Sequence, residues 1–168
     1  MASGKSSVGR RLERDLGMEM IDLDAVIEEK AGMTIPEIFS SVGEKAFRDL
    51  ESYVVDQICH QDNKIIATGG GAIVREKNRE IIKDTGFVVW LKTTPENVLK
   101  FSSSNENRPL IKDVKSLEKI QSMMDAREDF YHDCSHFSIN GFEHNLFSIS
   151  ELIREQYEHY KNQKFLTT

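Results

Sequence analysis

Three residues near the start of the chain have the types and the order of a phosphate-binding loop. Gly4-Lys5-Ser6 matches the second half of the pattern G-x-x-x-x-G-K-[ST]. In such a loop, backbone N–H groups and a helix N-terminus hold phosphates, the lysine reaches the β- and γ-oxygens, and the hydroxyl ligates Mg²⁺. So short a match also occurs by chance, but the amphipathic helix predicted directly after it favours function. We therefore expect a nucleotide to bind along Ser3, Gly4, Lys5, Ser6 and Ser7.

The front half of this loop is missing from the sequence. Counting back from Gly4 puts the first glycine of the pattern ahead of Met1. In nucleotide kinases, a strand inside the sheet leads into that glycine, so its loss leaves two neighbouring strands with unpaired backbone groups. We expect a single domain, 1–168, without this first strand and front glycine.

Two aspartates follow one another closely in Ile21-Asp22-Leu23-Asp24, which we expect to end a strand at 18–24. In an extended chain both carboxylates point to the same side. One can then hold a metal-bound water, while the other accepts a hydrogen bond from a substrate hydroxyl. Helix capping by these acids is the simpler explanation of the pair taken alone.

Three consecutive glycines, Gly69, Gly70 and Gly71, follow a compact apolar strand. Glycine loses more conformational entropy on folding than any other residue, so a turn alone explains three of them poorly. Close approach of the backbone to a ligand explains them better. We expect this loop to contact the substrate.

Two arginines are candidates for binding an anionic group. Arg48 precedes Glu51 by three residues on a predicted helix, a spacing at which the acid can orient the guanidinium. Arg127 and Tyr131 form a similar pair, four residues apart. Each pair taken alone is equally typical of ordinary surface charge.

A third arginine, Arg108, lies in the polar segment 102–115, which has neither helical nor strand periodicity. Such a segment is the best candidate in this chain for a mobile loop. An arginine in a loop that closes over a transferring phosphate can stabilise its charge. We therefore expect a lid here, with Arg108 acting on the phosphates.

The composition is that of an ordinary globular protein, with 39% hydrophobic and 30% charged residues. The net charge of −6 argues against nucleic acid as a partner, and no apolar run approaches the ~20 residues that span a bilayer. No signal peptide and only two cysteines predict a cytoplasmic protein. His132, Cys134 and His136 alternate as zinc ligands on a strand would, but without a fourth ligand a polar turn explains them better.

Helical and strand patterns alternate along the chain. We expect strands at 18–24, 64–68, 87–92 and 137–139, and helices at 5–16, 24–30, 34–39, 44–59, 76–84, 116–131 and 148–163, with one more opening at Thr94. This alternation predicts an α/β fold with a parallel sheet covered on both faces.

The combination of these segments resembles the shikimate kinase family along nearly the whole chain. The resemblance rests on GKSSVG (4–9), DLD (22–24), GMTIPEIF (32–39), GEKAFRDLE (43–51), ATGGG (67–71), RPL (108–110) and the segment 127–131. It implies transfer of the γ-phosphoryl group of ATP to the 3-hydroxyl of shikimate, with Mg²⁺, by a monomer. It also implies a P-loop fold like that of nucleoside-monophosphate kinases: a three-layer sandwich with a parallel sheet and a mobile lid.

On the nucleotide side, the resemblance implies that Lys5 binds phosphates and Ser6 ligates Mg²⁺. Asp22 corresponds to the acid that holds Mg²⁺ through water. Arg108 corresponds to the lid arginine that reaches the ATP phosphates.

On the substrate side, Asp24 corresponds to the acid that binds the hydroxyls and orients or deprotonates the attacking one. Arg48 and Arg127 correspond to the guanidiniums that hold the carboxylate, and Gly70 to the central glycine that contacts the substrate.

Two positions depart from the family. Members often carry a basic residue near the position of Phe101, a side chain that can stack on adenine but supplies no charge, and many place an arginine near His144, whereas no arginine appears here between Arg127 and Arg154. We expect weak or altered selectivity for the nucleotide base.

Two alternatives remain open on the sequence alone. Another small-molecule kinase, such as a gluconate kinase, also acts on a carboxylate. A kinase-like protein that binds without catalysis is consistent with the incomplete phosphate loop.

Overall fold

The structure is a computed structural model that describes residues 3–102 and 116–166. Arg108 and the predicted lid, apart from Ser102, lie outside the described residues.

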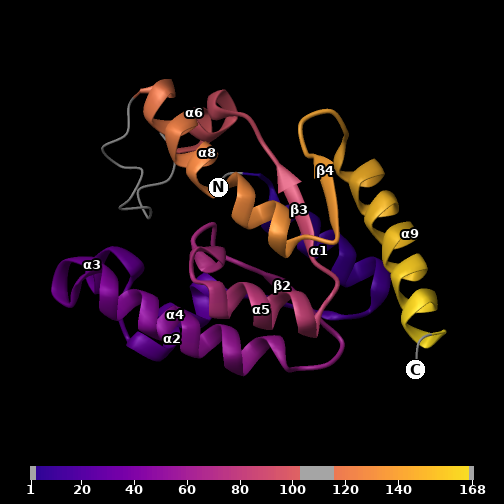
Figure 1. Ribbon diagram of the computed structural model, residues 1–168, viewed down its shortest axis with the longest axis horizontal. Coiled ribbons are helices and arrows are strands. Elements are labelled where there is room, and N and C mark those ends of the chain that lie inside the picture. The colour runs from indigo at the N-terminus through magenta and orange to yellow at the C-terminus, as the bar shows by residue number, and fades with distance from the viewer. Residues whose placement is uncertain (1–2, 103–115, 167–168) are drawn as a thin grey trace.

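Helices and strands alternate, as the sequence predicts (Figure 1). The elements are α1 (Lys5–Leu16), β1 (Glu19–Asp22), α2 (Leu23–Ala31), α3 (Ile35–Ser41), α4 (Gly43–Cys59), β2 (Lys64–Ala67), the 3₁₀ helix η1 (Ala72–Val74), α5 (Glu76–Thr85), β3 (Val89–Lys92), α6 (Pro95–Ser102), α8 (Leu117–Cys134), β4 (Phe137–Asn140) and α9 (Leu146–Phe165).

Local signals explain several element ends. Gly17 and Gly32 close α1 and α2 in the left-handed conformation, at φ 66° in both cases. Thr34 begins α3 with the predicted capping box: its N–H and its hydroxyl both donate to the Glu37 carboxylate, at 2.7 Å each. These caps depend only on residues a few positions apart, so they are readable from the sequence.

The predicted end of the first strand is wrong. The expected strand 18–24 ends at Asp22, and Asp24 lies in the first turn of α2. The Asp22 carboxylate accepts a hydrogen bond from the Asp24 N–H at 3.0 Å, so Asp22 is a helix N-cap. The chain turns from strand to helix there because this cap satisfies a backbone donor that a helix start leaves open.

The strands are parallel, but they form two separate pairs. β1 pairs with β2, with Ile21 opposite Ile66, and β3 pairs with β4, with Leu91 opposite Ile139. Among the described residues, no strand joins β2 to β3. The expected single sheet is therefore divided between these two strands.

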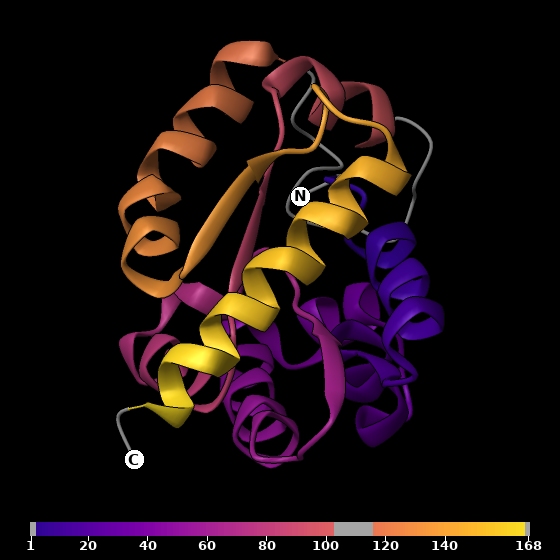
Figure 2. The same ribbon diagram turned by 90° about the vertical axis from the view of Figure 1, so that its right-hand side faces the viewer.

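Helices cover both faces of the strand layer. On one face α1 and α9 form a core around Val8, Leu12, Ile149 and Ile153, and Figure 2 shows α9 in front of the strands. On the other face a larger core joins α2, α3, α4, α5 and α8. The three-layer arrangement confirms the predicted α/β class.

The zinc interpretation of His132, Cys134 and His136 receives no support. His132 and Cys134 lie on α8 rather than on a strand, and Cys134 is buried. In the described ranges, no cluster of three or more metal-ligating side chains is present. None of the helices described is long and apolar enough to cross a membrane.

Candidate active site

The three-glycine loop after β2 is where most of the predicted site residues meet. A Cβ placed on Gly69 would lie 2.5 Å from Asp24 Oδ1, and one on Gly71 would lie 2.3 Å from Arg48 Nη1. A larger residue at either position would therefore have to displace the end of the Asp24 or the Arg48 side chain. The groups that approach these two glycines closely are the side chains of Asp24 and Arg48, and contact of the loop with a substrate stays a prediction.

Arg48 is held from two sides on α4. Its Nη1 donates to Glu51 Oε2 at 2.8 Å, and its Nη2 lies 3.3 Å from Glu44 Oε1. Arg48 is 8% exposed and Glu51 only 2%, whereas the Glu44 side chain is 57% exposed. The predicted orientation of Arg48 by Glu51 is confirmed, and this pair is a buried one rather than ordinary surface charge.

Glu51 lies in an environment that disfavours its charge. Burial raises the pKa of Glu51, the hydrogen bond and charge of Arg48 oppose that rise, and the negative charge of Asp24 adds to it. Asp24 is thus close enough to influence Glu51 electrostatically. One arginine and two carboxylates form a compact charged group beside the glycine loop.

Arg127 and Tyr131 reach the same loop from α8. Arg127 Nη1 donates to the Gly70 carbonyl oxygen at 3.2 Å, and the Tyr131 hydroxyl donates to that oxygen at 3.0 Å. The predicted helical pair therefore shares one acceptor, 57 and 61 residues away in the sequence. Both side chains fix the backbone of the loop.

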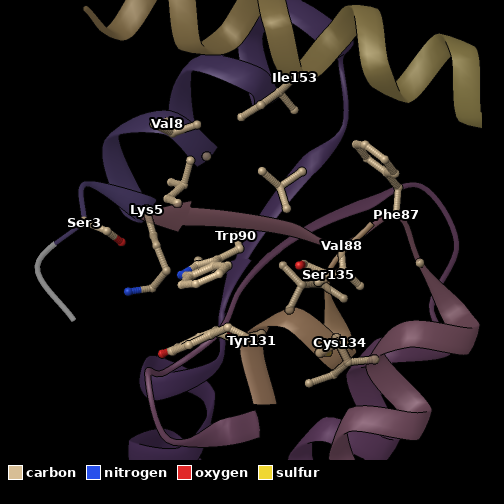
Figure 3. A pocket seen from close by; sticks show the side chains of 18 of the residues that line it. Ser3, Lys5, Val8, Phe87, Val88, Trp90, Tyr131, Cys134, Ser135 and Ile153 are labelled. Atoms are coloured by element: carbon tan, nitrogen blue, oxygen red, sulfur yellow. The ribbon is translucent and has the colours of Figure 1, made fainter. Parts of the chain in front are cut away.

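The phosphate-loop residues lie at the start of α1. Gly4 is the N-cap in the left-handed conformation, at φ 80°, and Val8 donates back to its carbonyl oxygen. Ser6 and Ser7 are exposed, and Ser3 and Lys5 are half-buried. A cavity of about 1170 Å³ is lined by Ser3, Lys5, Gly69, Gly70 and Arg127 together, and Figure 3 shows Lys5 beside the space that Trp90 and Tyr131 also face.

Three features of the site escaped the sequence analysis. Glu44 is a second partner of Arg48, and its spacing of four residues in the sequence would have suggested it. The hydrogen bond from Tyr131 to the Gly70 carbonyl oxygen joins residues 61 apart, so no pattern of neighbouring residues indicates it. Trp90 stacks on Tyr131 with ring centroids 5.1 Å apart and an interplanar angle of 9°, which depends on β3 and α8 lying side by side.

The chain is similar to known proteins over most of its length. The model of the family described as shikimate kinase matches residues 1–158. A shikimate kinase of Symbiobacterium thermophilum is 40% identical over 141 residues, which cover 83% of this chain and 81% of the relative. A shikimate kinase of Geobacter metallireducens is 44% identical over 133 residues, covering 79% of this chain and 74% of the relative.

Solved structures agree in fold. The shikimate kinase of Acinetobacter baumannii in complex with shikimate superposes with a TM-score of 0.89 at 35% identity, covering 96% of this chain and 90% of that one. The shikimate kinase of Aquifex aeolicus gives a TM-score of 0.81 at 30% identity, covering 96% of this chain and 94% of that one.

Proposed function

The chain belongs to the shikimate kinase family, and on this basis we propose that it transfers the γ-phosphoryl group of ATP to the 3-hydroxyl of shikimate. One observation supports this function best. Asp24 and Arg48 lie against Gly69 and Gly71, while Arg127 is bonded to Gly70 between them. A small acid with several hydroxyls needs this combination of cations for its carboxylate and an acceptor for its hydroxyls.

Arg48 and Arg127 bind the substrate carboxylate in this proposal. Glu51 and Glu44 set the direction of the Arg48 guanidinium before substrate arrives, which lowers the cost of ordering it. Arg127 is positioned through its bond to the Gly70 carbonyl. The absence of side chains at Gly69 and Gly71 lets the Asp24 carboxylate and the Arg48 guanidinium lie against the backbone of the loop.

Asp24 acts on the attacking hydroxyl. Its place beside Gly69, in the first turn of α2, puts a carboxylate at the edge of the loop. There it accepts the hydroxyl hydrogen bond and takes the proton as the oxygen attacks phosphorus.

Lys5 and the N–H groups of the first turn of α1 hold the phosphates of ATP, with Ser3, Gly4, Ser6 and Ser7 around them. Mg²⁺ binds few protein groups and keeps several waters as ligands. The exposed hydroxyl of Ser6 and the half-buried carboxylate of Asp22 fit this preference. When bound, Mg²⁺ neutralises charge on the phosphates. Arg108, outside the described residues, would act on the same phosphates from the lid.

The test is a coupled assay of ADP release with Mg-ATP, with and without shikimate. We expect release that depends on shikimate and is lost in Lys5→Ala. Arg48→Lys should raise the KM for shikimate by about tenfold or more, because a lysine cannot reproduce the planar fork held by Glu51. The matched control is Arg154→Lys, whose guanidinium pairs with Glu151 on α9 and does not line the cavity.

Two results would contradict the proposal. Equal or faster turnover with gluconate would assign another small-molecule kinase. Saturable binding of shikimate by a folded chain, without ADP release, would assign a non-catalytic binding protein.

A further inference from the structure

Every backbone carbonyl oxygen from Gly69 to Val74 accepts a hydrogen bond. The Gly69 oxygen accepts from the Ala72 N–H at 3.2 Å, and the Gly71 oxygen accepts from the Val74 N–H at 3.0 Å. The Gly70 oxygen accepts from α8, and the oxygens of η1 accept from side chains of α5. Three glycines have no side chains through which packing could fix them, so the position of the loop depends on these bonds.

Arg79, on α5, holds two of the η1 carbonyl groups. Its Nη1 donates to the Ile73 oxygen at 2.9 Å and to the Val74 oxygen at 3.1 Å. The Arg79 side chain is 13% exposed, so water competes little for these bonds. One guanidinium therefore fixes two successive peptide units just after the glycine loop.

Asn78 holds the remaining η1 carbonyl group and is fully buried. Its Nδ2 donates to the Ala72 oxygen at 2.9 Å, whereas its Oδ1 has no partner among the residues that the structure describes. A buried acceptor without a partner costs free energy that an apolar side chain of the same size would not cost. The amide of Asn78 therefore contributes through its donor, at the residue next to Gly71.

Arg79 also connects this turn to α8. Its Nε lies 3.2 Å from Asp133 Oδ2, and its guanidinium carbon lies 4.5 Å from the centroid of the Phe130 ring. The two helices, α5 and α8, pack against each other (Figure 1). Because the two donors to the Gly70 oxygen come from the same α8, Arg79 links both supports of the glycine loop.

We propose that Arg79 and Asn78 are positioning residues for the substrate, which act through η1 to hold the glycine loop against Asp24 and Arg48. Neither Arg79 nor Asn78 lines the cavity, so their effect on a ligand is indirect. The inference rests on the proposed function, because shikimate is the ligand that reports the position of the loop. Without these bonds the loop occupies several positions, and the affinity for substrate falls with the fraction that is competent to bind.

Hydrogen exchange tests the positioning of the loop without any substrate. Arg79→Met keeps the apolar part of the side chain and removes its donors. We expect the amides of Ala72 and Val74 to exchange at least about tenfold faster in this variant, while the amides of α1 and α9 keep their rates. Unchanged protection at Ala72 and Val74 would overturn the proposal.

Steady-state kinetics measure the effect on the substrate. Arg79→Met should raise the KM for shikimate by about tenfold, because it removes two hydrogen bonds that each change an equilibrium by roughly two- to tenfold. The kcat should change little, and the KM for Mg-ATP should stay the same. Arg79→Lys keeps donors but loses the planar fork, so its KM for shikimate should lie between those of Arg79→Met and the unaltered chain.

The matched control is Lys83→Met. Lys83 lies on the same helix and pairs with the same Asp133 carboxylate, at 3.6 Å, but in the described chain it makes no hydrogen bond to η1. We expect this variant to leave both the exchange of Ala72 and Val74 and the KM for shikimate unaltered.

Asn78→Leu provides a second, independent variant. It removes one donor to η1 rather than two, so it should change the exchange rates and the KM in the same direction as Arg79→Met but by less. If Arg79→Met fails to fold by circular dichroism, Asn78→Leu and Arg79→Lys still decide.

Two kinetic results would also overturn the proposal. Equal rises in the KM for shikimate and for Mg-ATP would indicate a general disturbance of the fold. A lower Tm of Arg79→Met with an unchanged KM for shikimate would assign Arg79 to stability alone. If the unaltered chain does not turn over shikimate, the proposed function fails, whereas the exchange rates of Ala72 and Val74 still test the positioning by Arg79 and Asn78.

Discussion

Arg48 and Glu51 form an ion pair inside α4, with Nη1 2.8 Å from Oε2 and with both residues buried. Arg48 lies against the Gly71 backbone, and the negative charge of Asp24 acts on Glu51. A buried pair of this kind is a weak source of stability, because the loss of hydration offsets the attraction. Its value here is that the guanidinium keeps one direction, toward the glycine loop.

The first prediction concerns the pH dependence of stability. Burial raises the pKa of Glu51 above its usual 4.5 in the folded chain. At pH values between 4.5 and this raised pKa, Glu51 is therefore protonated in the folded state and ionised in the unfolded state. The contribution of Glu51 to stability is therefore present below pH 4.5 and is lost as the pH rises through the raised pKa. Glu51→Gln should remove this dependence, measured as the difference in Tm between the two proteins across acidic and neutral pH.

The control for this prediction is Glu44→Gln, which alters the other partner of Arg48 at a side chain that is 57% exposed. The Tm of Glu44→Gln should differ from that of the unaltered chain by the same amount at every pH. Parallel curves for Glu51→Gln as well would refute the role assigned to burial.

The second prediction separates two roles within the glycine loop. Gly71→Ala should displace the Arg48 guanidinium and raise the KM for shikimate, while Gly69→Ala should displace the Asp24 carboxylate and lower kcat. Because misplacement of a reacting group by about 1 Å costs on the order of 100-fold, each effect should approach that size. Steady-state kinetics of both variants measure the split.

Gly86→Ala is the matched control for the glycine substitutions. A Cβ at Gly86 would have only the Ile82 carbonyl oxygen near it, at 4.0 Å. Its kinetics should equal those of the unaltered chain. A Gly71→Ala variant with unchanged KM would show that Arg48 does not need its observed position.

The third prediction tests Tyr131 as a positioning residue. Tyr131→Phe removes the bond to the Gly70 carbonyl oxygen and keeps the ring that stacks on Trp90. A net hydrogen bond contributes about 0.5–1.5 kcal/mol, so the KM for shikimate should rise by roughly two- to tenfold with kcat little changed. A fall in Tm with unchanged KM would instead indicate a purely structural role.

The fourth prediction concerns the thiols. Burial raises the pKa of Cys59 to about 11 and also raises that of Cys134. The thiolate is the reactive form, so a thiol reagent at mildly alkaline pH should label neither cysteine of the folded chain. Both should react once denaturant unfolds it, and stoichiometric labelling before unfolding would contradict their burial.

Features that depend on near neighbours can be predicted from the sequence. The capping box of Thr34 and Glu37, the end of α1 at Gly17 and the spacing of Arg48 to Glu51 involve residues at most four apart. Helical periodicity and backbone capping act over such distances, so their patterns are visible in the chain. The family resemblance also came from ordered local motifs, and the comparisons confirm the family.

Which of these motifs meet depends on how the strands and helices pack. The Gly70 carbonyl oxygen accepts from Arg127 and Tyr131, and Gly69 and Gly71 lie against Asp24 and Arg48 from two other helices. The division of the strands into two parallel pairs also depends on the tertiary structure. Strand order and helix packing set such contacts, because they join residues that local hydrogen bonds and periodicity do not connect.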